Sequence, residues 1–456
     1  MPRGGLLAAI RNPAQLVVGA FVALIAVGTF LLWLPLSIDG PRRLALDDAI
    51  FMSTSAATVT GFGSIDISRF SVFGEIVLLA LAQVGGFGIM TIGSVMAIVA
   101  SDRVGLRQRM LARAEIGTIE IGDVRELVAA IARITLGMEG VMAIILFVRF
   151  WSAGYEDRPV RAAYSAVFHA ISSFNNAGLS LYSDNLARFS GDWVVIMTVS
   201  IGFVIGGLGF PILVEFWRCN QRRRRERQHA RRPWSLHTKI TLLATAALLV
   251  VGPLVVILFE WSNPATLGPF DMPGKFLNGW LQGVTPRTSG FTTIDIGGMN
   301  EPTLLVISTL MFIGAGPAST SGGIKVTTFA VLGWVLWSEV RGNADVTVFR
   351  RRLPVTVIRQ AVTVALISVG VVVGATLLLM ASEGLALSPA LFESTSAFGT
   401  AGLTTGATVS MGPIGHVLLI LVMLAGRVGP VTFVTALALR DRARAYRYPE
   451  ERPIIG

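Results

Sequence analysis

Long apolar runs alternate with short mixed segments along the whole chain, and the runs occur in pairs. Each run reaches about the 20 residues that a helix needs to cross the ~30 Å hydrocarbon core of a bilayer. The runs lie at residues 14–37, 71–100, 127–151, 193–217, 238–261, 303–338, 355–381 and 413–439. The pattern therefore predicts eight membrane-spanning helices.

A shorter apolar stretch lies between the two runs of each pair and ends in a common motif. In each stretch an aromatic residue precedes a glycine by ten positions, and an apolar residue follows the glycine. The stretches are FMSTSAATVTGF (51–62), FHAISSFNNAGL (168–179), WLQGVTPRTSGF (280–291) and FESTSAFGTAGL (392–403). Their glycines are separated by 117, 112 and 112 residues. Ten residues are too few to cross a membrane, so we expect a re-entrant helix followed by extended backbone that turns back.

This regular spacing predicts four copies of one unit. Each copy would consist of a first spanning helix (M1), a pore helix (P) and a second spanning helix (M2). The predicted fold class is therefore an all-α membrane protein with eight spanning helices and four re-entrant pore helices around a pseudo-fourfold pore. We place the repeats at residues 1–110, 111–225, 226–345 and 346–456, the last with a basic cytoplasmic tail.

Composition and charge support a membrane protein. Of the 456 residues, 53% are apolar and 14% are charged, whereas a soluble domain usually has about 25% charged residues. The net charge of +10 comes from basic clusters at the junctions between repeats. The positive-inside rule predicts that these junctions and both termini are cytoplasmic. The single cysteine, Cys219, excludes an internal disulfide.

The glycine segments carry the candidate chemistry. Backbone carbonyls that face a common axis can replace the hydration shell of a monovalent cation without a catalytic side chain. Glycine suits such a segment because it adopts positive φ and lets the backbone approach the ion closely. No carboxylate lies in these segments, which argues against a calcium site. The candidate filter residues are Thr58, Val59, Thr60, Gly61, Asn175, Asn176, Ala177, Gly178, Arg287, Thr288, Ser289, Gly290, Gly399, Thr400, Ala401 and Gly402.

The segments TVTGF, NNAGL, RTSGF and TAGLTTG resemble those of the Trk/Ktr/HKT superfamily of potassium transporters, and the resemblance covers nearly the whole chain. With one apolar run before the first pore helix, the chain looks closest to a Ktr-type membrane subunit. The resemblance implies potassium uptake through a potassium-channel-like filter, in which four glycines go with potassium rather than sodium preference.

The same resemblance implies an assembly. It suggests a homodimer in the plasma (inner) membrane, with a pore in each protomer. It also implies a separate cytosolic ring of nucleotide-binding, RCK-type regulatory subunits, for which the arginine-rich cytoplasmic loops offer a docking surface. No cofactor is expected in the chain. Potassium would be the substrate and sodium a candidate activator.

Each M2 run contains a glycine-rich patch at a similar distance from its filter glycine. In the first two repeats, VGGFG (84–88) and IGGLG (205–209), we interpret the patch as close helix packing. The third, GAGPASTSGGIKVTT (314–328), cannot form an ordinary helix. We predict an intramembrane gating loop at 314–324, a feature that the superfamily also has. The candidate gate residues are Gly314, Gly316, Pro317, Ser319, Thr320, Ser321, Gly322, Gly323 and Lys325, although Lys325 would also suit snorkelling to the cytoplasmic interface.

Arg427 is an exception within the last M2 run. Internal alignment places it where the other repeats have Gly86, Gly207 and Ala315. A membrane-embedded arginine is costly and normally faces protein or water. One interpretation is a positive barrier in the ion path below the filter. The alternative is a buried ion pair, with Glu393 or Glu215 as the carboxylate.

Two alternatives to potassium uptake belong to other functional classes. The chain could be the potassium-binding subunit of an ATP-driven pump, but it contains no P-loop and no aspartyl-phosphate motif, so any ATP chemistry would belong to another chain. An intramembrane enzyme is not expected, because no Ser/His/Asp or paired-aspartate arrangement recurs at membrane depth. No dinucleotide-binding glycine fingerprint is present either.

Overall fold

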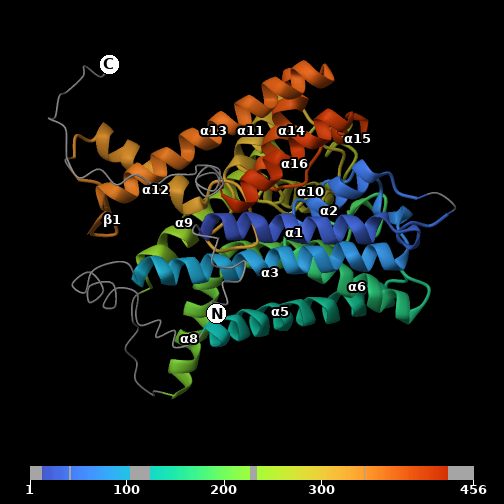
Figure 1. Ribbon diagram of the computed structural model, residues 1–456, viewed down its shortest axis with the longest axis horizontal. Coiled ribbons are helices and arrows are strands. Elements are labelled where there is room, and N and C mark those ends of the chain that lie inside the picture. The colour runs from blue at the N-terminus through green and yellow to red at the C-terminus, as the bar shows by residue number, and fades with distance from the viewer. Residues whose placement is uncertain (1–12, 41–42, 103–123, 226–233, 344, 430–456) are drawn as a thin grey trace, which may run out of the picture.

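The computed structural model describes residues 13–40, 43–102, 124–225, 234–343 and 345–429, and most of these residues are helical. Figure 1 shows the long helices α1, α3 and α5 running in nearly the same direction, with α13 on the opposite side of the body. The strands β1 (Thr347–Val348) and β2 (Arg351–Arg352) form one small antiparallel hairpin. Short helical turns in the connections are η2 (Pro35–Ser37), η3 (Ile67–Arg69), η4 (Ala187–Phe189) and α15 (Ala407–Ser410).

A long apolar helix followed by a short helix occurs four times. The long helices, at the M1 positions, are α1 (Pro13–Trp33), α5 (Val124–Ser152), α9 (Leu236–Glu260) and α13 (Val355–Glu383). The short helices, at the pore-helix positions, are α2 (Leu46–Ala57), α6 (Pro159–Phe174), α10 (Met272–Val284) and α14 (Leu387–Gly399). Each short helix packs against the long helix that precedes it. The short helices are rich in fully buried residues, so they form the centre of the molecule.

The M2 positions differ from one another. In the described part of the chain, α3 (Val72–Asp102) and α16 (Pro413–Val428) are uninterrupted. The third is divided into α11 (Glu301–Phe312) and α12 (Val326–Val340) by residues 313–325, as the proline and glycines predict. The second is also divided, into α7 (Trp193–Leu208) and α8 (Phe210–Arg225), which meet at 96°.

The break between α7 and α8 corrects the expectation of an unbroken apolar helix over 193–217. Gly209, at the junction, has φ +93°, which ends a right-handed helix. As Figure 1 shows, α8 extends away from the helical body. The glycine patch IGGLG therefore produces a bend as well as close packing.

The helices also differ in length from the apolar runs. Among the described residues, three helices are long and apolar enough to cross a bilayer, at Val128–Ser152, Leu236–Glu260 and Val355–Glu383, and the bent pair Trp193–Leu208 with Phe210–Trp217 adds a fourth. The remaining apolar helices are shorter: Val17–Trp33, Val72–Gly88, Glu301–Phe312, Val326–Val340 and Pro413–Val428. The chain is thus a multi-pass helical protein, and eight full spans stay a prediction.

The distribution of polar and apolar side chains is the reverse of that in a soluble protein. Large apolar side chains such as Ile144, Leu258 and Leu366 are more than 60% exposed on the outer helix faces. Many serine, threonine and asparagine side chains are buried near the ends of the short helices instead. Exposed apolar faces around a polar interior suit a lipid environment.

Candidate functional site

All four short helices end in a segment with the same backbone conformation. The glycine of each motif has positive φ, between 61° and 89°, as predicted. The residue two positions earlier is also left-handed, although it is never glycine. These residues are Val59, Asn176, Thr288 and Thr400. Because the residue between them has negative φ, the alternation turns successive carbonyl groups toward the same side of the segment.

The four segments meet one another in a closed order. A Cβ atom added to a motif glycine would fall against the backbone of the next segment in the chain, and the last segment returns to the first. Gly61 faces Ala177, Gly178 faces Ser289, Gly290 faces Ala401, and Gly402 faces Thr60. Residues that lie more than 100 positions apart thus converge on one centre. A side chain at any of these glycines would displace its neighbour.

The backbone oxygens of these segments lack hydrogen-bond donors. Within the described parts of the chain, the carbonyls of residues 58–61, 175–178, 287–290 and 399–402 accept no hydrogen bond, except that of Gly290. Nearly all of these residues are buried. Buried carbonyls in proteins almost always have a partner. A ring of unpaired carbonyls can therefore coordinate a cation or ordered water.

Two predicted filter residues direct their side chains away from the ring. The Asn175 amide donates to the Oε1 atoms of Gln83 at 2.6 Å and of Glu139 at 3.0 Å. The buried Arg287 guanidinium donates to the Thr245 hydroxyl at 3.3 Å. These residues therefore offer only their backbone to the ring. Glu139 was not singled out from the sequence, although it is a carboxylate within an apolar run.

Hydroxyl groups hold the outer end of three segments. Ser55, Ser172 and Thr285 each donate at 2.7 Å to the carbonyl of the residue that follows the motif glycine. These residues were not predicted from the sequence, although a serine or threonine lies five or six positions before each glycine and could have indicated them. In the fourth repeat the Ser396 hydroxyl has no partner in the described structure.

A glutamate holds the outer loop of the fourth repeat instead. Buried Glu393 accepts hydrogen bonds from the hydroxyls of Thr404 at 2.7 Å, Thr405 at 3.0 Å and Thr408 at 2.6 Å. Its carboxylate is therefore hydrogen-bonded to these threonines, on the outer side of the ring.

Residues 313–325 lie directly beneath three of the four segments. The Thr320 hydroxyl lies 3.0 Å from the amide oxygen of Asn176, and the Ser321 hydroxyl accepts a hydrogen bond from Thr288. The Gly322 amide donates to the Thr400 hydroxyl at 2.9 Å. The predicted gate residues are thus brought against the left-handed residues of the second, third and fourth segments.

The same loop is bonded to the break between α7 and α8. The Gly316 amide donates to the Gly207 carbonyl at 2.8 Å, and the Phe210 amide donates to the Ala318 carbonyl at 3.1 Å. These bonds satisfy backbone groups that the interrupted helix leaves without partners. Lys325 is half-buried and donates to the Ser321 carbonyl at 2.6 Å, so its side chain folds back onto the loop.

Arg427 reaches the loop and the first repeat together. Its buried guanidinium donates to the Thr320 carbonyl and, at 3.3 Å, to the Gly85 carbonyl. Of its two candidate carboxylates, Glu393 binds threonines, and Glu215 accepts a 2.9 Å bond from the Ser235 hydroxyl. Within the described part of the chain Arg427 makes no ion pair with either carboxylate, so its partners there are backbone carbonyls.

Close packing of the M2 glycines is confirmed. A Cβ atom on Gly85, Gly206 or Gly426 would fall against the carbonyl of the residue four positions before the motif glycine of the same repeat. These glycines let M2 backbones approach the ends of the short helices.

An open cavity of about 260 Å³ lies on the outer side of the ring. It is lined by Gly61, Gly63, Asn185, Gly290, Thr292, Ile294, Asp295, Ile296, Gly402, Leu403 and Thr404. Three motif glycines thus border a space that is open to solvent. The loop 313–325 lies on the opposite side of the ring.

The chain is similar in sequence to known transport proteins. Residues 5–445 match the TrkH family, described as "Cation transport protein". The chain is 37% identical to the Ktr system potassium uptake protein B of Bacillus subtilis (strain 168) over 450 residues, covering 97% of this chain and 96% of the relative. It is 35% identical to the protein of the same name from Vibrio alginolyticus over 452 residues, covering 97% and 94%.

A solved structure shares the fold. The potassium transporter TrkH from Vibrio parahaemolyticus superimposes with a TM-score of 0.74 at 21% identity, over 94% of this chain and 86% of that chain. This likeness supports the helical architecture. With the family match over almost its whole length and two relatives above 30% identity, the chain belongs to the TrkH family of cation transport proteins, which are membrane transporters and not enzymes.

Proposed function

We propose that this protein takes up potassium across the plasma membrane as the ion-translocating subunit of a Ktr-type system. The observation that carries the proposal is the ring of mostly buried carbonyls at residues 58–61, 175–178, 287–290 and 399–402. Within the described part of the chain, only that of Gly290 has a hydrogen-bond donor. Carbonyl oxygens replace the hydration shell of potassium. The names of the relatives from Bacillus subtilis and Vibrio alginolyticus support potassium as the ion.

Four M1–P–M2 repeats would surround the ion path. The closed order of the four glycine segments supports a pseudo-fourfold axis through their centre. An ion entering from the outer cavity would pass the ring and reach the loop below it. The membrane potential would drive uptake, because about 2.3 kcal/mol is available per charge for each 100 mV.

The loop at 314–324 acts as the gate in this proposal. Its hydrogen bonds to Asn176, Thr288 and Thr400 keep it beneath the ring, where it obstructs the path. Arg427 adds a positive charge at the same level. An open state requires that the loop leave these partners.

Regulation would reach the loop from the cytoplasm. The bonds from Gly316 to Gly207 and from Phe210 to Ala318 join the loop to the α7–α8 bend, so a movement of α8 would move the loop. We propose a cytosolic ring of nucleotide-binding, RCK-type subunits as the partner of a homodimer. Much of the predicted docking surface, at 103–113, 226–233 and 440–447, lies outside the described residues. Sodium activation stays a hypothesis, and no observation favours the pump-subunit alternative.

The proposal is tested by flux into proteoliposomes that contain the purified chain. Potassium or rubidium should enter in preference to sodium under an inside-negative potential. Added regulatory subunits should change the rate. A folded protein that carries no potassium, or carries sodium equally well, would refute the proposed function.

A further inference from the structure

Asn185, in the outer loop of the second repeat, contacts the end of the third segment. Its amide Nδ2 lies 3.4 Å from the Gly290 carbonyl oxygen, and its Oδ1 accepts a 3.3 Å hydrogen bond from the Thr292 amide. The neighbouring Leu186 amide donates to the Thr292 carbonyl at 3.0 Å. Two repeats are thus joined at the outer edge of the carbonyl ring.

The position of Asn185 is set by its own loop. It has φ +53°, a left-handed conformation that asparagine adopts more readily than most residues. The backbone amide of Asn185 donates to the Tyr182 carbonyl at 3.0 Å, and its backbone carbonyl accepts a 3.0 Å hydrogen bond from the Ser180 hydroxyl. Both its backbone groups and its side chain therefore have partners.

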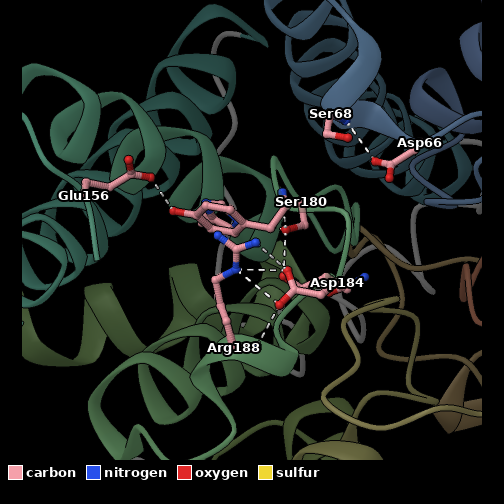
Figure 2. Close-up of polar contacts among 9 residues, drawn as sticks. Asp66, Ser68, Glu156, Ser180, Asp184 and Arg188 are labelled. Atoms are coloured by element: carbon pink, nitrogen blue, oxygen red, sulfur yellow. Dashed lines mark hydrogen bonds and ion pairs between the residues drawn. The ribbon is translucent and has the colours of Figure 1, made fainter. Parts of the chain in front are cut away.

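Charged neighbours hold this loop, as Figure 2 shows around Ser180, Asp184, Arg188 and Glu156. Arg188 pairs with Asp184 at 2.8 Å and lies 4.0 Å above the ring of Tyr182. The Tyr182 hydroxyl donates to Glu156 at 2.7 Å. Burial raises the pKa of Tyr182, so its hydroxyl keeps its proton at neutral pH. These contacts therefore hold the loop that carries Asn185 in one conformation.

The contact makes the third segment different from the other three. Among the described residues, Gly290 has the only ring carbonyl with a hydrogen-bond donor. We propose that Asn185 is a positioning residue for selectivity: it fixes the direction of the Gly290 carbonyl at the outermost ion site. In the size-selection account of a carbonyl filter, a carbonyl held in one direction closes less readily around the smaller sodium ion than a free one does. This inference rests on the proposed function.

The test is Asn185→Gly in proteoliposomes. Glycine accepts positive φ at no cost, so the loop keeps its conformation while both side-chain bonds disappear. Because the modest hydrogen bond to the Gly290 carbonyl is one of the two that are lost, we expect the potassium-to-sodium flux ratio to fall roughly threefold. A purely structural role would lower potassium and sodium flux together and leave their ratio unchanged.

Asn263→Gly provides a matched control. The Asn263 side-chain amide also donates to a backbone carbonyl, that of Gly298 at 2.8 Å, and its oxygen accepts from the Ala265 amide at 3.0 Å. It makes one further bond, to the Glu260 carboxylate at 2.6 Å, so the variant is at least as disruptive locally. Since Gly298 is outside the ring, this variant should keep the wild-type ratio. An equal change in both variants would overturn the inference.

Asn185→Asp separates the two bonds. Aspartate retains an acceptor for Thr292 but has no donor for Gly290, so it should lose selectivity as the glycine variant does. The added charge raises the local concentration of both cations, so the flux ratio and not the absolute flux is compared with that of the glycine variant. A wild-type ratio in either Asn185 variant overturns the inference while the proposed function stands, whereas a wild-type protein without potassium preference refutes the proposed function itself.

Discussion

Replacing Arg427 by glutamine should raise the flux through each protomer. The guanidinium places a positive charge close to the underside of the ring, because Thr320 contacts both Arg427 and Asn176. Glutamine is neutral and has one NH2 group, so it can keep one of the two carbonyl contacts. The change removes charge from the proposed path and weakens the link between the loop and Gly85.

The size of the effect follows from Coulomb's law. At roughly 8 Å and an effective dielectric constant near 20, two unit charges repel by about 2 kcal/mol. That energy corresponds to about thirtyfold in rate, and salt in the path reduces it. We therefore expect an increase of about tenfold in potassium flux.

The assay is potassium flux in proteoliposomes, normalised to folded protein by size-exclusion chromatography. Losing one hydrogen bond from a charged donor costs about 1.5–3 kcal/mol, which a thermal unfolding curve will register. Arg427→Lys is the matched control, because it keeps the charge but not the two-armed contact. A folded glutamine variant with unchanged or lower flux would refute the barrier, and an equal rise in the lysine variant would assign the effect to the loop contact instead of the charge.

Three further predictions concern the ring, the gate and the bend. Gly402→Ser should reduce potassium-to-sodium selectivity, because the added Cβ would enter the next segment. Gly406→Ser is the control, since Gly406 is also left-handed but has open space around it, and equal selectivity in the two variants would contradict the ring. Deleting residues 318–322 should raise basal flux and abolish control by added regulatory subunits, and wild-type regulation would exclude a gate. Gly209→Ala should cost about 1–2 kcal/mol of stability at its left-handed position and displace Pro317, so basal flux should rise; unchanged flux in a destabilised protein would limit the bend to a structural role.

Much of the architecture was predictable because it repeats and depends on local chemistry. Four glycines at regular spacing indicated backbone with positive φ, and each of them has it. Pro317 and its neighbouring glycines excluded a helix for a reason that holds in any surroundings. The family resemblance followed from the same segments and is confirmed by the family match.

Other features depend on contacts between residues that are distant in sequence. A local sequence pattern does not predict these contacts. The break at Gly209 arises where the loop of another repeat supplies hydrogen bonds to Gly207 and Phe210. A similar glycine patch in α3 leaves that helix unbroken. Local preference permits a bend, and only the tertiary partner determines whether it forms.

Partner choice for buried polar groups was likewise decided by the tertiary structure. The sequence identified Arg427 as unusual but left its partner open, and the folded chain supplies two carbonyls, from Thr320 and Gly85, in place of a carboxylate. Nothing in the sequence distinguishes Asn185 from other residues of a polar loop, yet its side chain contacts Gly290, more than 100 residues away in the chain. The amino-acid sequence alone determined which four segments have a glycine with positive φ. The packing of the four repeats determined which side chains hold those segments, because hydrogen bonds between distant residues exist only once the helices have assembled.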